Sequence, residues 1–233
     1  MTSRDNGLWL KFWRDKRSDF HQKNVNRLLT RFWPNLNPLA GSRVFVPLCG
    51  KSLDMIWLAK QGHEVIGVEL SPVAVKAFFR ENKLQPVKLK RGQFTLWKHG
   101  KISILCGDFF ELTRKDLGEI DLVYDRAALT ALPDDIRILY VAHMKKILPV
   151  TVRMLLLTAE DVDVKDKTDP VLVVDEEINT LFAEDFQIDL THVESMVEDD
   201  FPSCLQSAEP VEYKVYLLCA KLKTSWEDLT TRH

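Results

Sequence analysis

The sequence lacks the features that would mark a disulfide-stabilised, secreted or membrane-spanning protein. Its four cysteines are scattered over 233 residues, and no two of them form a Cys-x-x-Cys pair. This spacing argues against a disulfide framework and a structural zinc site, and it favours reduced thiols in the cytoplasm. The apolar runs are too short or too charged to span a bilayer, and charged residues break the N-terminal stretch where a signal peptide would be apolar. We therefore expect a cytoplasmic protein that does not associate with membranes.

The chain also carries no excess of charge of either sign. With 32 lysines and arginines against 34 aspartates and glutamates, its formal net charge is −2 at pH 7. Without a basic field it has no general attraction for nucleic acid, and we expect no such partner. The length and the apolar fraction of 45% suit a single globular domain. We expect a helical N-terminal lid segment over residues 1–40, an α/β core over 41–222 and a tail over 223–233.

Glycine is scarce where a phosphate-binding loop would need it. A predicted strand over residues 42–48 is followed by the turn Cys-Gly-Lys-Ser at 49–52, which holds one glycine. A P-loop needs glycine at position 45, where Phe45 stands, so ATP or GTP binding by that motif is excluded. A nicotinamide-binding loop needs three glycines around the pyrophosphate. The turn therefore favours S-adenosylmethionine (SAM), an adenosyl cofactor without a pyrophosphate, over NAD.

Apolar strands alternate with helical segments from residue 42 onward, which is typical of an α/β fold with a parallel sheet. The last two strands are joined by a segment with little helical signal, and we expect them to pair antiparallel. The predicted fold has a seven-stranded, mostly parallel sheet with an antiparallel C-terminal strand, helices on both faces and an N-terminal helical cover. We expect strands at 42–48, 64–69, 102–106, 120–125, 152–159, 186–193 and 211–222, a hairpin strand at 94–97, and helices at 4–33 with a break near Asn24, at 53–61, at 72–82, at 134–147 and after 175.

Two acids stand at the ends of predicted strands, where open α/β sheets bind ligands. Glu69 lies 19 positions after Gly50, a spacing at which a carboxylate can accept two hydrogen bonds from a ribose diol. The alternative is a solvated acid that simply ends the strand. Asp108 can accept from an adenine amino group while Phe109 packs on the ring. The alternative there is a turn-forming aspartate beside two core phenylalanines.

Arg126 follows Asp125 at the end of the fourth core strand. It can pair with a carboxylate, such as that of a methionine moiety, or with an anionic substrate. The alternative is an internal salt bridge between Asp125 and Arg126 that holds the loop.

Aromatic residues recur at helical spacing near the N-terminus. Trp9, Trp13 and Phe20 can form a lid over a cofactor, or they can belong to an amphipathic helix that packs on the core. His21 can carry a proton, or it can be an ordinary hydrogen-bonding residue.

Several of these motifs occur together in one known family. The chain resembles the thiopurine S-methyltransferase family over about residues 9–160 and in the terminal strand 213–221. Of these motifs, the Pro-Leu-Cys-Gly-Lys block and the Asp-Arg-x-Ala-Leu block are together specific to that family. The matching segments are Trp9-x-x-x-Trp13 with Phe20-His21, residues 44–52, Gly62-His63-x-Val65-x-Gly67-Val68-Glu69, and residues 125–129.

The resemblance implies a class I methyltransferase fold of Rossmann-like type and SAM as methyl donor, with S-adenosylhomocysteine as product. It assigns the stretch from Trp9 to Phe20 to the cover of the cofactor, and it matches Asp108 and Phe109 to the adenine segment. Arg126 is then the residue nearest the transferring methyl group, and we take it as the catalytic residue. By position, the cofactor site also includes Trp13, Leu48, Gly50 and Glu69.

One departure bears on the methyl acceptor. Thiopurine-methylating members carry an arginine-rich segment before the final strand, whereas this chain has acids at 198–200 and at Glu209. An acidic rim would repel an anionic thiolate. The acceptor is expected to be a thiopurine or another small aromatic or heterocyclic thiol. Selenium or tellurium species, a non-catalytic adenosyl-binding protein and a nicotinamide oxidoreductase are the alternatives.

The chemistry that the resemblance implies makes few demands on the protein. A sulfonium is a strong leaving group, and a heterocyclic thiol is largely anionic near neutral pH, so positioning of the two reactants matters most. We therefore expect no essential catalytic base and no metal, and the resemblance implies that the enzyme is a monomer.

Overall fold

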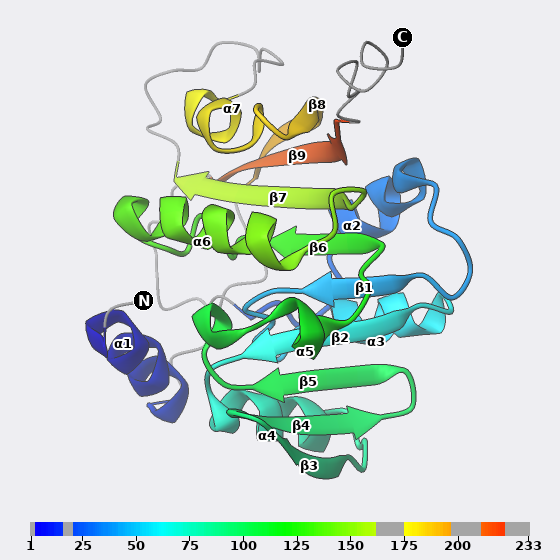
Figure 1. Cartoon of the computed structure of the whole chain (residues 1–233), viewed down its shortest axis with the longest axis vertical. Helices are drawn as coiled ribbons and strands as arrows, with labels where there is room; N and C mark the ends of the chain where they lie inside the picture. The colour runs from blue at the N-terminus through cyan, green and yellow to red at the C-terminus, as the bar shows by residue number, and fades with distance from the viewer. Residues whose placement is uncertain (1–2, 16–20, 162–174, 197–210, 222–233) are drawn as a thin grey trace, which may run out of the picture.

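The computed structural model describes residues 3–15, 21–161, 175–196 and 211–221 (Figure 1). Strands and helices alternate along most of these residues, as expected. The strands are β1 (Arg43–Val46), β2 (Glu64–Glu69), β3 (Val87–Arg91), β4 (Phe94–His99), β5 (Ile102–Cys106), β6 (Leu122–Arg126), β7 (Arg153–Asp161), β8 (Phe186–Met196) and β9 (Val211–Ala220). The α-helices are α1 (Ser3–Arg14), α2 (Arg27–Phe32), α3 (Asp54–Lys60), α4 (Pro72–Glu81), α5 (Arg114–Leu117), α6 (Asp134–Ile147) and α7 (Glu176–Phe182), and two short 3-10 turns are η1 (Trp33–Leu36) and η2 (Phe109–Glu111).

All nine strands join one sheet in the order β3-β4-β5-β2-β1-β6-β7-β9-β8. The five central strands, in the order β5-β2-β1-β6-β7, are parallel to one another. Strand β9 pairs antiparallel with both β7 and β8, and the β3–β4 and β4–β5 pairs are antiparallel too. The predicted α/β sheet with parallel central strands and an antiparallel C-terminal strand is therefore confirmed.

The sheet has two more strands than the seven expected, because the hairpin before β5 is longer. Strand β4 corresponds to the predicted hairpin strand, and β3 was not predicted at all. Four of the five β3 residues are exposed and three are lysine or arginine, so β3 lacks the apolar alternation that signals a buried strand. Its basic side chains suit an edge strand, since they discourage pairing with another chain.

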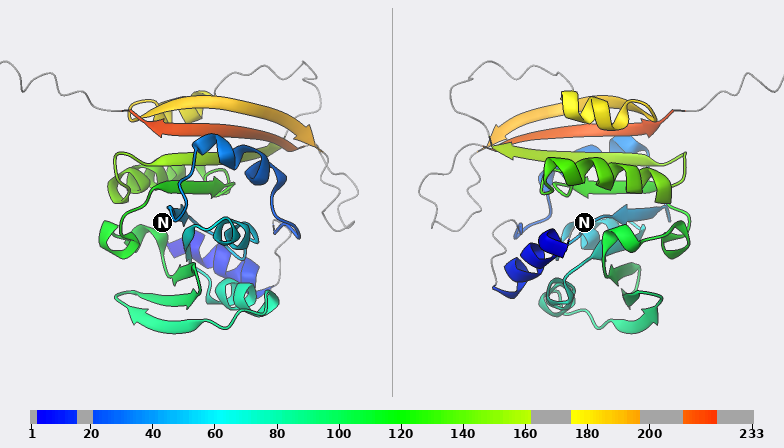
Figure 2. Two further views of the ribbon diagram at one scale, coloured as in Figure 1. Left: turned by 90° about the vertical axis from the view of Figure 1, so that its right-hand side faces the viewer. Right: turned by 60° about the vertical axis from the view of Figure 1, so that its left-hand side comes forward.

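Successive residues of the central strands point into two separate cores. Phe45 and Val123 pack on the side of α5, α6 and α7, whereas Val44, Val46 and Leu122 pack on the side of α2, α3 and α4. Figures 1 and 2 show these two groups of helices on opposite faces of the sheet. A strand buried on both faces needs apolar residues at every position, which explains the continuous apolar runs.

Local signals fix the ends of several helices. Helix α4 begins where the Ser71 hydroxyl accepts a hydrogen bond from Ala74 N, with Pro72 at its first position. Helix α2 begins where the Asn26 side chain accepts from the backbone N–H groups of Leu28 and Leu29. The predicted break in the N-terminal helix is confirmed, because residues 21–26 are not helical.

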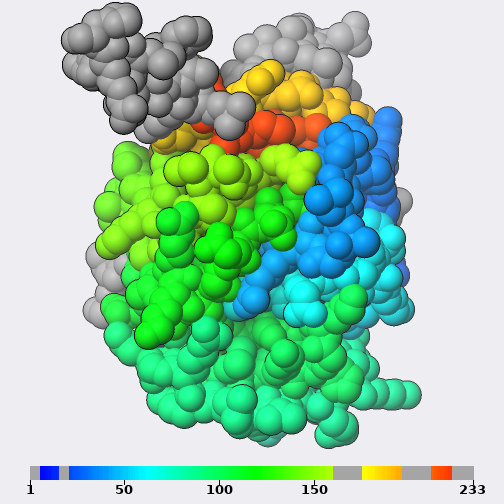
Figure 3. Space-filling model, turned by 45° about the vertical axis from the view of Figure 1, so that its right-hand side comes forward, coloured from blue at the N-terminus to red at the C-terminus, as the bar shows by residue number. Residues whose placement is uncertain are grey.

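Helix α1 lies beyond the carboxyl ends of the parallel strands and contacts α4 (Figure 1). Helix α2 reaches toward the C-terminal strands, as Figure 3 shows, where Arg27 pairs with Glu194 at 2.6 Å and Phe32 packs on His192. The N-terminal segment thus contacts the sheet at two places. Among the described residues, no helix combines the length and apolar character needed to cross a membrane.

Candidate cofactor and active site

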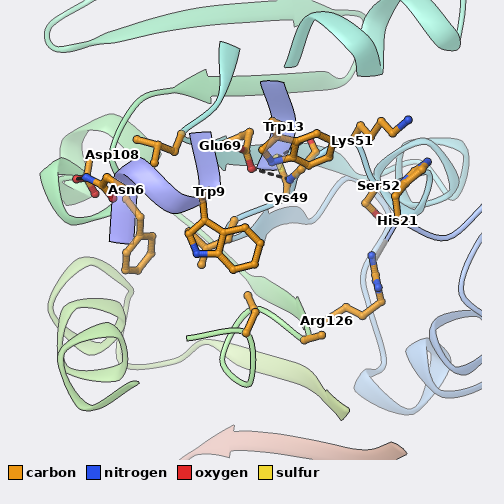
Figure 4. A pocket seen from close by; sticks show the side chains of 17 residues that line it. Asn6, Trp9, Trp13, His21, Cys49, Lys51, Ser52, Glu69, Asp108 and Arg126 are labelled. Carbon is orange, nitrogen blue, oxygen red and sulfur yellow. Dashed lines mark hydrogen bonds between the residues drawn. The ribbon is translucent and has the colours of Figure 1, made fainter. Parts of the chain in front are cut away.

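A cavity of about 150 Å³ opens at the carboxyl ends of the central strands, where an α/β sheet binds its ligand. Residues from α1 form one wall, and His21 and the ends of β1, β2, β5 and β6 with the turns that follow them form the rest (Figure 4). Eight predicted site residues line it: Trp9, Trp13, Leu48, Gly50, Glu69, Asp108, Phe109 and Arg126. Phe20, which was also predicted, lies outside the described residues.

Glu69 is the buried acid at the centre of this cavity. Its side chain accepts hydrogen bonds from Gly50 N at 2.9 Å and from Ser71 N at 2.7 Å, one on each oxygen. These bonds fix the carboxyl group between the turns that follow β1 and β2. Each carboxylate oxygen keeps a further lone pair, so two ribose hydroxyls can still donate to it.

Burial raises the pKa of Glu69 from its ordinary value of 4.5 to about 7, although the backbone N–H groups of Ser71 and Gly50 oppose the rise. A group with this pKa is half ionised near neutral pH. Hydroxyl donors that bind it would favour the ionised form. Glu69 is 6% exposed, so the alternative that it is a solvated acid at the end of a strand is wrong, whereas its role in ribose binding stays a prediction.

The turn after β1 is shaped to bring backbone close to a ligand. Leu48 and Gly50 both have positive φ angles, of 44° and 53°. Such angles strain a leucine and favour glycine, and strained residues of this kind gather at functional sites. A Cβ atom on Gly50 would stand 3.1 Å from the Trp13 ring. Gly50 is therefore required both by its conformation and by its aromatic neighbour.

Both tryptophans of α1 line the cavity. Trp13 is 6% exposed, and its ring lies beside Glu69, while Trp9 lies across the middle of the site (Figure 4). Helix α1 thus contributes aromatic surface to the cavity as well as to its own packing. The role of this segment as a cover over the cofactor stays a prediction.

Asp108 already has partners within the protein. One oxygen accepts from Phe110 N at 3.0 Å, which caps the short turn η2, and the other accepts from Asn6 of α1 at 2.8 Å. The turn-forming interpretation of Asp108 is therefore confirmed. Phe109 is 2% exposed and packs on Tyr140 with ring centroids 4.8 Å apart. A role of either residue in adenine binding stays a prediction.

Arg126 does not rest on Asp125. The Asp125 carboxyl accepts from Tyr140 OH at 2.7 Å and from Ala128 N at 3.1 Å, while Arg126 Nε lies 3.3 Å from Asp54. The internal Asp125–Arg126 salt bridge proposed as an alternative is therefore wrong. Sequence proximity suggested it, but consecutive strand residues point to opposite faces of the sheet.

The turn after β6 combines strain with a buried acid. Ala127 has a φ angle of 55°, and its N–H donates to Leu157 O at 2.8 Å. Burial raises the pKa of Asp125 to about 6, against the effect of its hydrogen bonds from Tyr140 and Ala128. Arg126 at this tight turn lines the cavity, and the hydrogen bonds to Asp125 hold the turn in place.

His21 lines the same cavity, close to Ser52 and Lys51 (Figure 4). Burial, and then the positive charges of Lys51 and Arg126, lower the pKa of His21 to about 4. The imidazole is consequently neutral at pH 7. Lys51 is paired with Glu81 at 2.8 Å.

Sequence reasoning missed Asp54 and Asn6, and it gave Lys51 no role in the site. Asp54 begins α3 and its carboxylate reaches Arg126, yet an aspartate in the first turn of a helix is ordinary. Asn6 contacts Asp108 across 102 positions of sequence, a contact that no local pattern encodes. Among the residues that the structure describes, no three histidines, cysteines or acids are grouped to hold a metal ion.

Comparisons with known proteins agree with this geometry. A model of the thiopurine S-methyltransferase family matches residues 4–221. A thiopurine S-methyltransferase of Stutzerimonas stutzeri is 56% identical over 229 residues, which cover 97% of this chain and 96% of the relative. One of Nitrosospira multiformis is 46% identical over 174 residues, covering 75% of this chain and 79% of the relative.

The fold is shared with solved structures at low sequence identity. A SAM-dependent methyltransferase of Anabaena variabilis superposes with a TM-score of 0.64 at 16% identity, covering 92% of this chain and 94% of that one. The predicted class I methyltransferase fold is thereby confirmed. Taken with the family match over nearly the whole length, these likenesses allow one conclusion about identity: the chain belongs to the thiopurine S-methyltransferase family.

Proposed function

We propose that this protein transfers the methyl group of SAM to the sulfur of a thiopurine or of another small aromatic or heterocyclic thiol, leaving S-adenosylhomocysteine. The observation that carries the proposal is the buried Glu69 carboxyl, held by two backbone donors in a cavity at the strand ends. A ribose diol fits its remaining lone pairs. The family to which the chain belongs supports methyl transfer over nicotinamide chemistry.

Different residues of the cavity would recognise the ribose, the adenosyl part and the methionine part of the cofactor. Glu69 would accept from the ribose hydroxyls, and the turn at Leu48 and Gly50 would bring backbone N–H and C=O groups against the adenosyl part. Trp9 and Trp13 would cover the bound cofactor with aromatic surface. Arg126 would pair with the carboxylate of the methionine part, because a guanidinium matches a carboxylate in shape and charge.

Adenine would lie near the turn after β5. Asp108 Oδ2, which accepts from Asn6, also has a lone pair for the adenine amino group. Phe109 would meet the ring only at its edge, because most of Phe109 is buried against Tyr140.

When bound, SAM supplies an activated methyl group on a sulfonium sulfur. The protein has to exclude water and hold the acceptor sulfur in line with the methyl carbon and its leaving sulfur. A bond between the methyl carbon and the acceptor sulfur would form as the bond from that carbon to the sulfonium sulfur breaks. The thiol proton would already have been lost to water. The positive charge of Arg126 favours the anionic acceptor before the transfer.

No dedicated base is needed for this reaction. His21 is neutral at pH 7, but a heterocyclic thiol largely ionises on its own, so His21 is proposed to shape the cavity. The reaction is also proposed to need no metal, and the enzyme to act as a cytoplasmic monomer without nucleic acid or membrane. Turnover that is unchanged by EDTA would support the metal-free proposal, and turnover lost to EDTA and restored by a divalent cation would overturn it.

The test is calorimetric titration with S-adenosylhomocysteine. Saturable binding by the wild type is expected, with a loss of at least about tenfold in Glu69→Ala, equivalent to about 1.4 kcal/mol. Glu64→Ala is a matched control, because Glu64 is an exposed acid at the opposite end of the same strand. No binding by the wild type, or equal losses in both variants, would contradict the proposal.

The acceptor is tested separately, since the acids at 198–200 and at Glu209 lie outside the described residues. Incubation with SAM and 6-mercaptopurine is expected to yield the S-methyl product, with selenols as a second panel. Cofactor binding without any methylated product would argue for a non-catalytic adenosyl-binding protein.

A further inference from the structure

Asp54 is a buried carboxylate that lies next to Arg126 but does not line the cavity. It lies in the first turn of α3 and is 1% exposed. Three groups from different parts of the chain converge on it. Asn26 N donates to Oδ1 at 2.8 Å, Tyr124 OH donates to Oδ2 at 2.9 Å, and Arg126 Nε lies 3.3 Å from the same Oδ2.

A buried carboxylate persists only where cations and donors compensate the loss of water. Tyr124 and Arg126 are two residues apart on β6, so their side chains leave the strand on the same face and reach the same oxygen. Burial, and then the negative charge of Asp54, raise the pKa of Tyr124 well above its ordinary value, so its hydroxyl remains a donor. Hydrogen bonds from Asn26 and Tyr124 thus hold the Asp54 carboxylate independently of Arg126.

The contact with Asp54 uses only the inner edge of the Arg126 guanidinium. Arg126 Nε lies 3.3 Å from Asp54 Oδ2 in an ion pair, although its N–H is not aligned for a hydrogen bond, and the side chain is 20% exposed as it extends toward His21 and Ser52 (Figure 4). A guanidinium has five N–H donors in a rigid planar fork. Because the group is planar, an ion pair that restrains its Nε edge also restrains the direction of the outer N–H groups.

We propose that Asp54 is the positioning residue for Arg126, and that it fixes the guanidinium plane which receives the carboxylate of the bound cofactor. The inference rests on the proposed function, since it takes SAM as the ligand. It goes beyond that function by assigning a role to a residue outside the cavity lining.

The same carboxylate ties the N-terminal segment to the site. Asn26 gives its backbone N–H to Asp54 and uses its side chain to cap α2. Residues 21–25 precede it directly and bring His21 to the cavity. Asp54 consequently joins the end of β6, the start of α3 and the connection from α1 in one hydrogen-bonded cluster.

The experiment is a double-mutant cycle, read by calorimetric titration with S-adenosylhomocysteine. The variants are Asp54→Asn, Arg126→Ala and the two combined. The wild type should bind, and Asp54→Asn should weaken binding at least about tenfold, as expected for a charge-assisted contact. In the Arg126→Ala background, Asp54→Asn should change the affinity by less than about twofold, because the group it positions is gone.

A second ligand separates positioning from general damage. The probe 5′-methylthioadenosine has the adenosyl part but no carboxylate, so Asp54→Asn should leave its affinity within about twofold of wild type. Tyr124→Phe is the matched control. It removes a hydrogen bond from the same Oδ2 but keeps the negative charge, so it should lower the melting temperature with little change in S-adenosylhomocysteine affinity.

Several results would overturn the inference. They are an unchanged affinity in Asp54→Asn, equal losses for both ligands, and additive losses in the double variant. If Asp54→Asn does not fold, Asp54→Glu enters the same cycle, because it keeps the charge and shifts it by one methylene. A wild type that binds neither ligand would overturn the proposed function, and this inference with it, so the two failures are distinguishable.

Discussion

The raised pKa of Glu69 predicts how cofactor binding depends on pH. Burial raises that pKa to about 7 in the ligand-free protein. The ribose hydroxyls are donors, and they bind the ionised carboxylate better than the protonated acid. Binding must therefore lower the pKa of Glu69 and release a proton near pH 7, and by linkage the affinity must rise with pH.

The magnitude follows from the ionised fraction. With a pKa of about 7, Glu69 is about 9% ionised at pH 6 and about 91% ionised at pH 8. If only the ionised form binds, the affinity rises about tenfold over this range, or about 1.4 kcal/mol. Above pH 8 it should level off.

Other titrating groups near Glu69 do not produce this profile. Burial raises the pKa values of Cys49 and Cys106, the latter to about 11, so both thiols stay neutral between pH 6 and 8. His21, with a pKa of about 4, is neutral throughout. Asp125, with a pKa of about 6, would give a midpoint lower by one unit.

The assay is calorimetric titration with S-adenosylhomocysteine at pH 6, 7 and 8, repeated in buffers of different ionisation enthalpy to count released protons. Glu69→Gln keeps the shape of the side chain without a titrating group, and its affinity should not change with pH. An affinity of the wild type that is flat across this range would refute the reasoning. So would a pH dependence that survives in Glu69→Gln.

Three further changes test other parts of the site. Gly50→Ala should weaken S-adenosylhomocysteine binding by at least about tenfold and lower the free energy of unfolding by about 1 kcal/mol or more. The reason is that alanine is strained at a φ of 53° and that its Cβ would displace Trp13. A variant with the affinity and melting temperature of the wild type in calorimetry would contradict this. Tyr140→Phe should lower the free energy of unfolding by about 1–3 kcal/mol in urea titrations, since it leaves the buried Asp125 without its hydroxyl donor, whereas an unchanged midpoint would show that the bond contributes nothing. His21→Gln should retain most of the turnover, because no base is required, and loss of turnover with intact cofactor binding would identify His21 as the base.

The fold was predictable where each strand and helix carries its own signal. The bounds of β2 and α6 match the predicted 64–69 and 134–147, because an apolar run and an acidic first turn mark them locally. Strand β3 escaped prediction because it lies exposed at the edge of the sheet. Its pairing with β4 is decided by the hairpin and not by apolar periodicity.

The site was predictable in its residues but not in its contacts. Glu69, Gly50 and Arg126 could be placed because the ends of parallel strands meet at one edge of the sheet. The partner of Arg126 could not be placed, because Asp54 lies on a different element and is brought near only by the packing of α3 on the sheet. Sequence proximity pointed to Asp125 instead, and the structure shows that Asp125 anchors the turn.

The central claim is that the Glu69 cavity holds SAM for methyl transfer to a small heterocyclic thiol. The most direct measurement is mass spectrometry of products after incubation with SAM carrying a trideuterated methyl group and 6-mercaptopurine. We expect the S-methyl product to carry the label, in equal amount to the S-adenosylhomocysteine formed, and both to fall together in Glu69→Ala. Absence of labelled product from 6-mercaptopurine and from a panel of heterocyclic thiols, in a wild type that binds S-adenosylhomocysteine, would contradict the claim.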